Sequence, residues 1–193
     1  ELVWVGAGLD RVAVYFRDLD NGPWFGIDER RSYTPGSLFK VPVMMAALRQ
    51  AELVPGYFGQ KVRFPGLPDP RLASSWFGQE ETLEAGREYA IEDLLYRVAV
   101  HSDNASTWLL RQTIRKELLE RTLADMGFDP ARMEMGGRTL TAKSYGRFFR
   151  ILYNASYLSR PMSEFALSLF AEASFKDGLV AGVPPGTVVA HKF

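Results

Sequence analysis

Two short runs of β-branched and aromatic residues, 12–17 and 24–27, form the first clear pattern along the chain. Between them lies Asn21-Gly22, a pair that favours the tight turn of a β-hairpin because both residues tolerate a positive φ. This region therefore predicts two antiparallel strands.

The pattern becomes helical after a break at residues 33–36. Residues 37–52 are apolar on nearly every side, as at Val43, Met44 and Leu48, and a helix of that kind is buried. We expect it to be the central helix of the fold. Pro42 falls within its first turns, where a missing N–H is tolerated.

Shorter amphipathic helices follow an irregular stretch, 55–86, that is rich in glycine and proline. Apolar residues recur at helical spacing from Ile91 to Val98 and predict a helix that ends before Ser102. Four more helices are expected: one from Asn104, one over 118–126 that Gly127 stops, and two with N-caps at Thr141 and Ser159.

The last pattern is a turn at Pro184-Pro185-Gly186, followed by an expected strand over 187–193. The order strand, strand, helices, strand indicates an α+β fold. In this fold, an antiparallel sheet made from both chain ends holds an inserted helical lobe. We expect residues 1–193 to form a single domain.

Composition narrows the chemistry that is available. Of the 193 residues, 47% are hydrophobic, and 23 basic residues balance 23 acidic ones. Such a chain forms a globular domain, and its scattered, balanced charge gives no general attraction to nucleic acid or anionic membranes. The absence of cysteine excludes disulfides, thiolate metal sites and a cysteine nucleophile. We expect no cofactor and no metal. The longest apolar run, 41–48, is too short to cross a bilayer.

Ser37 and Lys40 stand three residues apart at the start of the predicted central helix. That spacing places both on one helical face. A serine hydroxyl becomes a good nucleophile when a base takes its proton, and lysine can be that base when burial lowers its pKa. The spacing alone is weak evidence, because an N-capping serine and a surface lysine give the same pattern.

Two further motifs carry polar groups suited to the same chemistry. Ser102-Asp103-Asn104 lies between two predicted helices, where the hydroxyl can relay a proton and the amide can bind a carbonyl. Asp103 is expected to brace this loop. His101 is interpreted as a helix-end residue rather than as a general base. Lys192 follows on the expected C-terminal strand.

In this order, S-x-x-K, S-D-N and His191-Lys192-Phe193 resemble the motif set of class A β-lactamases and penicillin-binding proteins. The segments 33–36, 91–95 and 177–189 are also similar to that family, so the resemblance covers most of the chain. It implies that Ser37 accepts the acyl group, that Lys40 is its base or proton relay, and that Ser102 protonates the departing nitrogen. Asn104 would bind the substrate amide, and Lys192 would help to bind its carboxylate.

Two departures from the family pattern affect the expected chemistry. Phe193 stands where the family usually has Thr or Ser, which removes a hydroxyl from the carboxylate site. Class A β-lactamases also carry a Glu-x-x-Leu-Asn segment whose Glu activates the deacylating water, and residues 127–141 contain no such segment. Glu134 is a weaker candidate for that role, the alternative being a solvated loop residue. Trp76 and Phe77 are weaker candidates for an aromatic wall at the site mouth, the alternative being partial burial.

The resemblance implies a serine hydrolase that acts on β-lactams or D-Ala-D-Ala peptides through an acyl-serine intermediate. Two alternatives stay open: a D,D-carboxypeptidase or transpeptidase, and a non-catalytic module that binds penicillin or peptidoglycan. We expect a monomer in the periplasm or outside a bacterium, with its targeting segment absent from this chain. The family's oxyanion hole and sheet continue past the third motif, so we expect a catalytic domain truncated just inside that motif.

Overall fold

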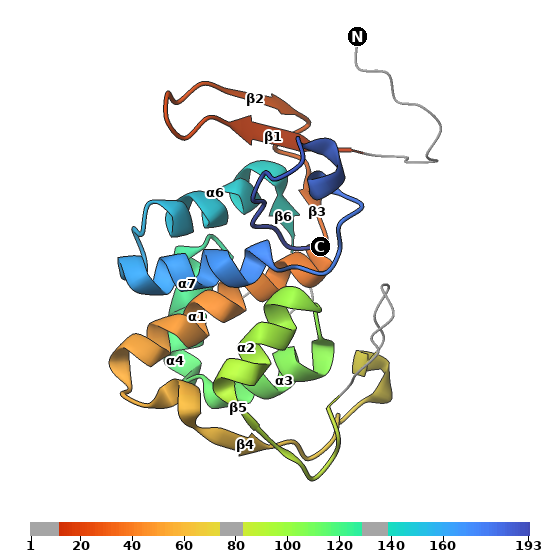
Figure 1. Ribbon diagram of the computed structural model, residues 1–193, viewed down its shortest axis with the longest axis vertical. Coiled ribbons are helices and arrows are strands. Elements are labelled where there is room, and N and C mark those ends of the chain that lie inside the picture. Colours follow the sequence, from red (N-terminus) through yellow and green to blue (C-terminus); the bar gives the residue numbers. More distant parts are fainter. Residues whose placement is uncertain (1–11, 74–82, 129–138) are drawn as a thin grey trace.

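The centre of the fold is one long helix, seen in a computed structural model that describes residues 12–73, 83–128 and 139–193 (Figure 1). Residues 41–48 of this helix, α1 (Lys40–Leu53), are all buried, which confirms the predicted central helix. Apolar side chains point in every direction from α1 because other helices surround it. These are α2 (Ile91–Val100), α3 (Asn104–Thr113), α4 (Lys116–Asp125) and α7 (Arg160–Ala171).

The amphipathic helices lie where their patterns predict them. Helix α2 ends before Ser102, and α3 begins at Asn104. Thr141 caps α6 (Ala142–Tyr153) by accepting a 3.0 Å hydrogen bond from the N–H of Ser144. Gly127 follows α4 with a φ of 90°, a conformation that favours glycine at a helix end. Among the described residues, no helix is both long and apolar enough to span a membrane.

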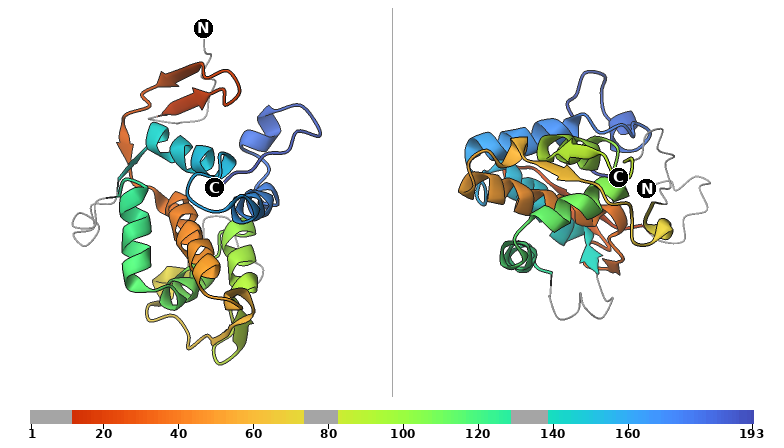
Figure 2. Two further views of the ribbon diagram at one scale, coloured as in Figure 1. Left: turned by 90° about the vertical axis from the view of Figure 1, so that its left-hand side faces the viewer. Right: turned by 90° about the horizontal axis from the view of Figure 1, so that it is seen from below.

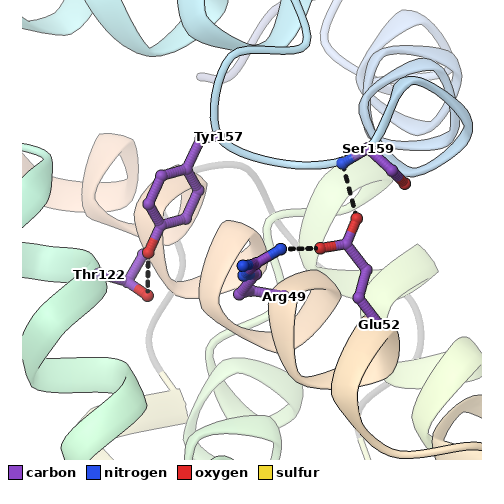
Figure 3. Close-up of polar contacts among 5 residues, drawn as sticks. All are labelled: Arg49, Glu52, Thr122, Tyr157 and Ser159. Atoms are coloured by element: carbon purple, nitrogen blue, oxygen red, sulfur yellow. Dashed lines mark hydrogen bonds and ion pairs between the residues drawn. The ribbon is translucent and has the colours of Figure 1, made fainter.

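The loop before α7 is tied to two other helices (Figure 3). Ser159 occupies the N-cap of α7 as predicted, but its side chain makes no capping bond. Its N–H instead donates to Glu52 at the end of α1 over 2.6 Å, and Glu52 also pairs with Arg49 at 2.6 Å. Tyr157 donates to Thr122 of α4 at 2.9 Å. These bonds fix the position of α7 relative to α1.

In the described parts of the chain, three small antiparallel sheets accompany the helices. The predicted hairpin is present as β1 (Val14–Arg17) and β2 (Trp24–Ile27), and β1 packs on α6 (Figures 1 and 2). Strand β3 (Ser32–Tyr33) pairs with β6 (Leu140–Thr141). Strand β4 (Lys61–Arg63), in the stretch predicted as irregular, pairs with β5 (Glu88–Ala90). Helices and antiparallel strands together confirm the α+β class.

The prediction of a C-terminal strand over residues 187–193 is wrong. Residues 187–193 form no ladder with any strand in the described parts of the chain, and β1 and β2 pair only with each other there. The backbone bonds of this segment go elsewhere. The N–H of His191 donates to the carbonyl of Phe170 in α7 at 3.2 Å, and the main-chain oxygen of Phe193 accepts from the side chain of Lys192. The segment therefore lies against α7 and the start of α1 instead of extending a sheet.

Candidate active site

Ser37 lies in a 3₁₀ turn, η1 (Gly36–Phe39), that leads directly into α1. The N–H of Lys40 donates to the carbonyl of Ser37 and closes this turn. Side chains three residues apart are eclipsed in a 3₁₀ turn, so Ser37 and Lys40 share one face. The sequence predicted that shared face from helical spacing, and the tighter turn aligns the two residues more closely than an α-helix would.

The ammonium group of Lys40 reaches the loop between α2 and α3. Its Nζ lies 3.0 Å from Ser102 Oγ and also donates to the Ser102 carbonyl. The Lys40 side chain is buried, and this burial lowers its pKa to about 8, while the carboxylate of Asp103 acts in the opposite direction. A lysine with this pKa loses its proton far more readily than a surface lysine does. It can therefore accept a proton from a neighbouring hydroxyl.

The loop that presents Ser102 is held in an unusual conformation. Ser102 has a φ of 55°, in the left-handed region, which costs a residue other than glycine about 1–2 kcal/mol. The N–H of Asp103 donates to the Arg97 carbonyl at 3.2 Å. The Asp103 carboxylate accepts 3.0 Å hydrogen bonds from the N–H groups of Ala105 and Ser106 and so caps α3. These contacts agree with the expectation that Asp103 braces the loop.

Lys192 brings a second buried lysine side chain to the same place. Its Nζ donates to the main-chain oxygen of Phe193 at 3.0 Å and lies 4.0 Å from the centre of the Phe193 ring. Burial, and then the charge of Lys40, lower the pKa of Lys192 to about 6. Ser102 Oγ lies 3.5 Å from the same oxygen of Phe193. Three distant parts of the chain thus meet beside the first turn of α1, where Figures 1 and 2 show the C-terminus.

The two histidines are the sequence neighbours of Ser102 and Lys192. His191 is buried behind Lys192, and its Nε2 has no hydrogen-bond partner among the described residues. Burial and then the charges of Lys176 and Lys192 lower the pKa of His191. His101 is the exposed C-cap of α2 and packs edge-on against Tyr96 with ring centres 5.6 Å apart. That position fits the interpretation of His101 as a helix-end residue.

The predicted site residues divide into two groups. The structure gathers Lys40, Ser102 and Lys192, places Ser37 one turn before Lys40, and starts α3 at the half-buried Asn104. The weaker candidates lie outside the described residues, and their roles stay predictions: Glu134, Trp76 and Phe77. Within the described ranges, no group of three or more His, Asp or Glu side chains is arranged to hold a metal.

Two structural features of the site were missed by the sequence analysis. One is the left-handed backbone of Ser102, which no residue pattern signals. The other is Phe175, whose ring centre lies 5.4 Å from that of Phe193 and supports it over Lys192. The capping of α3 by Asp103 had a signal, because an Asp three residues before Ser106 at a helix start is a common N-cap pattern.

Comparison with known proteins identifies the family. The sequence profile described as the beta-lactamase enzyme family matches residues 5–193. The chain belongs to the beta-lactamase enzyme family. A search of curated protein sequences gives no significant match.

Solved structures show the same fold for this family member. A PBP-A mutant in an acyl-enzyme complex with penicillin-G is similar with a TM-score of 0.77 and 18% identity, over 94% of this chain and 70% of that one. The TLA-3 extended-spectrum beta-lactamase is similar with a TM-score of 0.75 and 18% identity, over 93% of this chain and 70% of that one. A beta-lactamase from Sphaerobacter thermophilus DSM 20745 is similar with a TM-score of 0.73 and 20% identity, over 90% of this chain and 67% of that one. These likenesses establish the β-lactamase-like fold that the sequence predicted.

Proposed function

We propose that this member of the beta-lactamase enzyme family is a serine hydrolase whose Ser37 is acylated by β-lactams or D-Ala-D-Ala peptides. One observation carries the proposal. Lys40 is buried, its pKa is lowered to about 8, and its Nζ lies 3.0 Å from Ser102 Oγ, one 3₁₀ turn beyond Ser37. Acyl transfer to a serine needs a base for the serine hydroxyl and a second group that passes the proton on. Lys40 would be the base for Ser37, and the Ser102 hydroxyl would be the second group.

The proposed reaction uses these groups in order. Neutral Lys40 takes the proton of Ser37 as the Ser37 Oγ attacks the carbonyl carbon of the substrate. The Lys40–Ser102 contact then passes a proton to the nitrogen that leaves when the C–N bond breaks. Asn104, at the start of α3, binds the substrate amide. A substrate carboxylate near Lys192 raises the pKa of Lys192 again, because an opposite charge favours the ammonium form.

The rival function in this proposal is a binding module without turnover. One observation favours it: Lys192 Nζ already donates to the main-chain oxygen of Phe193 and faces its ring, so this side chain has partners before substrate arrives. The acyl-enzyme complex of the PBP-A mutant with penicillin-G, on the same fold, supports acylation instead.

Peptidoglycan and β-lactams are met outside the cytoplasm, so we propose that the protein acts in the periplasm or outside the cell.

Labelling with a fluorescent penicillin tests the proposal. Wild type, Ser37→Ala and the control Ser156→Ala, which alters an exposed serine before α7, are incubated with the reagent and separated under denaturing conditions. We expect wild type and Ser156→Ala to carry the label and Ser37→Ala to lack it. An unlabelled wild type would favour the binding module, and label retained by Ser37→Ala would exclude Ser37 as the nucleophile.

A further inference from the structure

A cavity of about 250 Å³ lies between the β1–β2 hairpin and helix α6, apart from the Lys40–Ser102–Lys192 cluster. Its lining shares no residue with that cluster. Three arginines, Arg17, Arg147 and Arg150, contribute to it, together with the aromatic side chains of Tyr15, Phe16 and Phe149. The cavity therefore combines positive charge with an apolar wall.

Three of the cations of this region line the cavity, and a fourth, Lys143, lies 4.6 Å from the centre of the Trp24 ring. Arg147 and Arg150 follow Lys143 at helical spacing on α6, and Arg17 joins them from the end of β1. None of these four cations forms an ion pair with another described residue.

Two acidic residues of the hairpin and the turn after it, Asp18 and Glu29, have other partners. The carboxylate of Asp18 accepts hydrogen bonds from the N–H groups of Asp20 and Asn21 at 2.8 and 3.2 Å. Glu29 pairs with Arg30 at 3.4 Å. Neither of these two carboxylates forms an ion pair with the three arginines of the cavity.

The apolar wall continues onto the surface of the hairpin. Phe16 stacks on Phe25 with ring centres 5.1 Å apart, and the two residues are 51% and 53% exposed. On the other side, Gly146 lets β1 approach α6 closely, because a Cβ at this position would come within 2.8 Å of Tyr15 Cδ1. Glycine in a helix interior is less favourable than alanine, so close packing is the physical reason for it here.

We propose that this cavity binds a phosphate group carried on an apolar body. A guanidinium group donates two parallel N–H bonds to a phosphate, which makes arginine the preferred residue for this anion. The aromatic side chains give the apolar part a surface to pack on. Such a ligand comes either from a soluble phosphate ester or from the headgroup of an anionic lipid. This inference does not depend on the chemistry of Ser37.

Calorimetric titration with dihexanoyl phosphatidic acid, kept below its micelle concentration, tests this site. The test variant is the double substitution Arg147→Gln/Arg150→Gln, and the control is Arg121→Gln/Arg160→Gln, which removes the same charge at exposed positions on α4 and α7. We expect the test variant to bind at least about tenfold more weakly than wild type, a loss of about 1.4 kcal/mol in binding free energy, because it lacks the charge-assisted hydrogen bonds of two guanidinium groups. The control should bind like wild type. Circular dichroism checks that each variant is folded.

Two further ligands sharpen the result. Inorganic phosphate should bind more weakly than the dihexanoyl compound because it lacks the apolar part. Sedimentation with vesicles of phosphatidylglycerol but not of phosphatidylcholine would identify a lipid headgroup as the source, and binding of the soluble ester without sedimentation would identify a soluble one. The proposal is overturned by absence of saturable binding to wild type, by equal binding to wild type and the test variant, or by inorganic phosphate binding as tightly as the ester.

Discussion

Among single residues, we propose that Lys40 controls when Ser37 reacts, because only a neutral lysine takes a proton. Burial lowers the pKa of Lys40 to about 8, so the neutral form increases as pH rises through that value. We expect the rate constant for acylation by penicillin G to increase with pH through about 8 and to be lost in Lys40→Met. Mass spectrometry of the adduct at short reaction times measures this rate constant. A rate that is equal on both sides of pH 8 would contradict this role.

Because the pKa of Lys40 is lower in the folded chain than in the unfolded chain, this residue makes the free energy of unfolding depend on pH. Between pH 8 and the ordinary value of 10.5, the unfolded chain binds more protons at this residue than the folded chain does. The free energy of unfolding therefore rises with pH across this interval. Urea denaturation at several pH values should show a steeper rise for wild type than for Lys40→Met, which has no proton to lose. Equal slopes would mean that the folded protein does not lower this pKa.

We propose a proton-relay role for Ser102, whose backbone is also strained, and two substitutions separate these two properties. Ser102→Ala and Ser102→Gly both remove the hydroxyl beside Lys40, so both should slow acylation by about 10²–10⁴-fold, the usual contribution of a proton-transfer group. Because φ is 55° at this position, Ser102→Gly should be more stable than Ser102→Ala by about 1 kcal/mol. Acylation rates and urea denaturation test the two effects. Acylation at the wild-type rate in either variant would exclude the relay.

At the scale of elements, close packing of the hairpin on α6 sets the shape of this part of the fold. Gly146→Ala improves intrinsic helix propensity but places a Cβ 2.8 Å from Tyr15 Cδ1. We expect it to destabilise the protein by about 1–3 kcal/mol, as overpacking does. The control is Gly182→Ala, where a Cβ would meet no atom within 4 Å. Urea denaturation compares them, and equal stability of the two variants would show that Tyr15 simply moves aside.

The elements that the sequence predicts well are those stabilised by one continuous pattern. Helices α2 and α6 have a single apolar face and begin or end at recognisable residues, such as the N-cap Thr141. The short pairs β3–β6 and β4–β5 could not be predicted, because two or three residues carry no pattern and the partners lie far apart, as Ser32 and Thr141 do. Residues 187–193 look like a strand, but their backbone bonds go to α7 and to a neighbouring side chain.

The candidate site, like the fold, has parts that the sequence predicts and parts that only the folded chain shows. The motifs that contain Ser37, Lys40 and Ser102 are readable in the sequence, and so is the chemistry that each residue type permits. The contact between Lys40 and Ser102 spans 62 residues and exists only in the folded chain. Arg17 likewise joins Arg147 and Arg150 only because β1 packs on α6, so their shared cavity could not be inferred from evenly balanced charge.

At the scale of the whole molecule, release of the acyl group is the step for which the sequence offers no clear catalyst. Residues 127–141 contain no Glu-x-x-Leu-Asn segment, and a general base contributes about 10²–10⁴-fold. We therefore expect the penicillin adduct to persist long after free penicillin is removed, and to persist equally in Glu134→Gln. Mass spectra collected over time measure the loss. Rapid hydrolysis of nitrocefin that Glu134→Gln abolishes would instead assign the deacylating base to Glu134.

Acylation of Ser37 is the central claim, and mapping of the penicillin adduct tests it most directly. Trypsin cleaves after Arg31 and Lys40, so Ser37 is released in the peptide Ser32–Lys40. Opening of the β-lactam ring expels no atoms, and the modified peptide should therefore gain the full mass of penicillin G. Fragmentation should place that mass on Ser37. An adduct on the intact chain that maps to Ser32, to Thr34 or to another peptide would contradict the assignment.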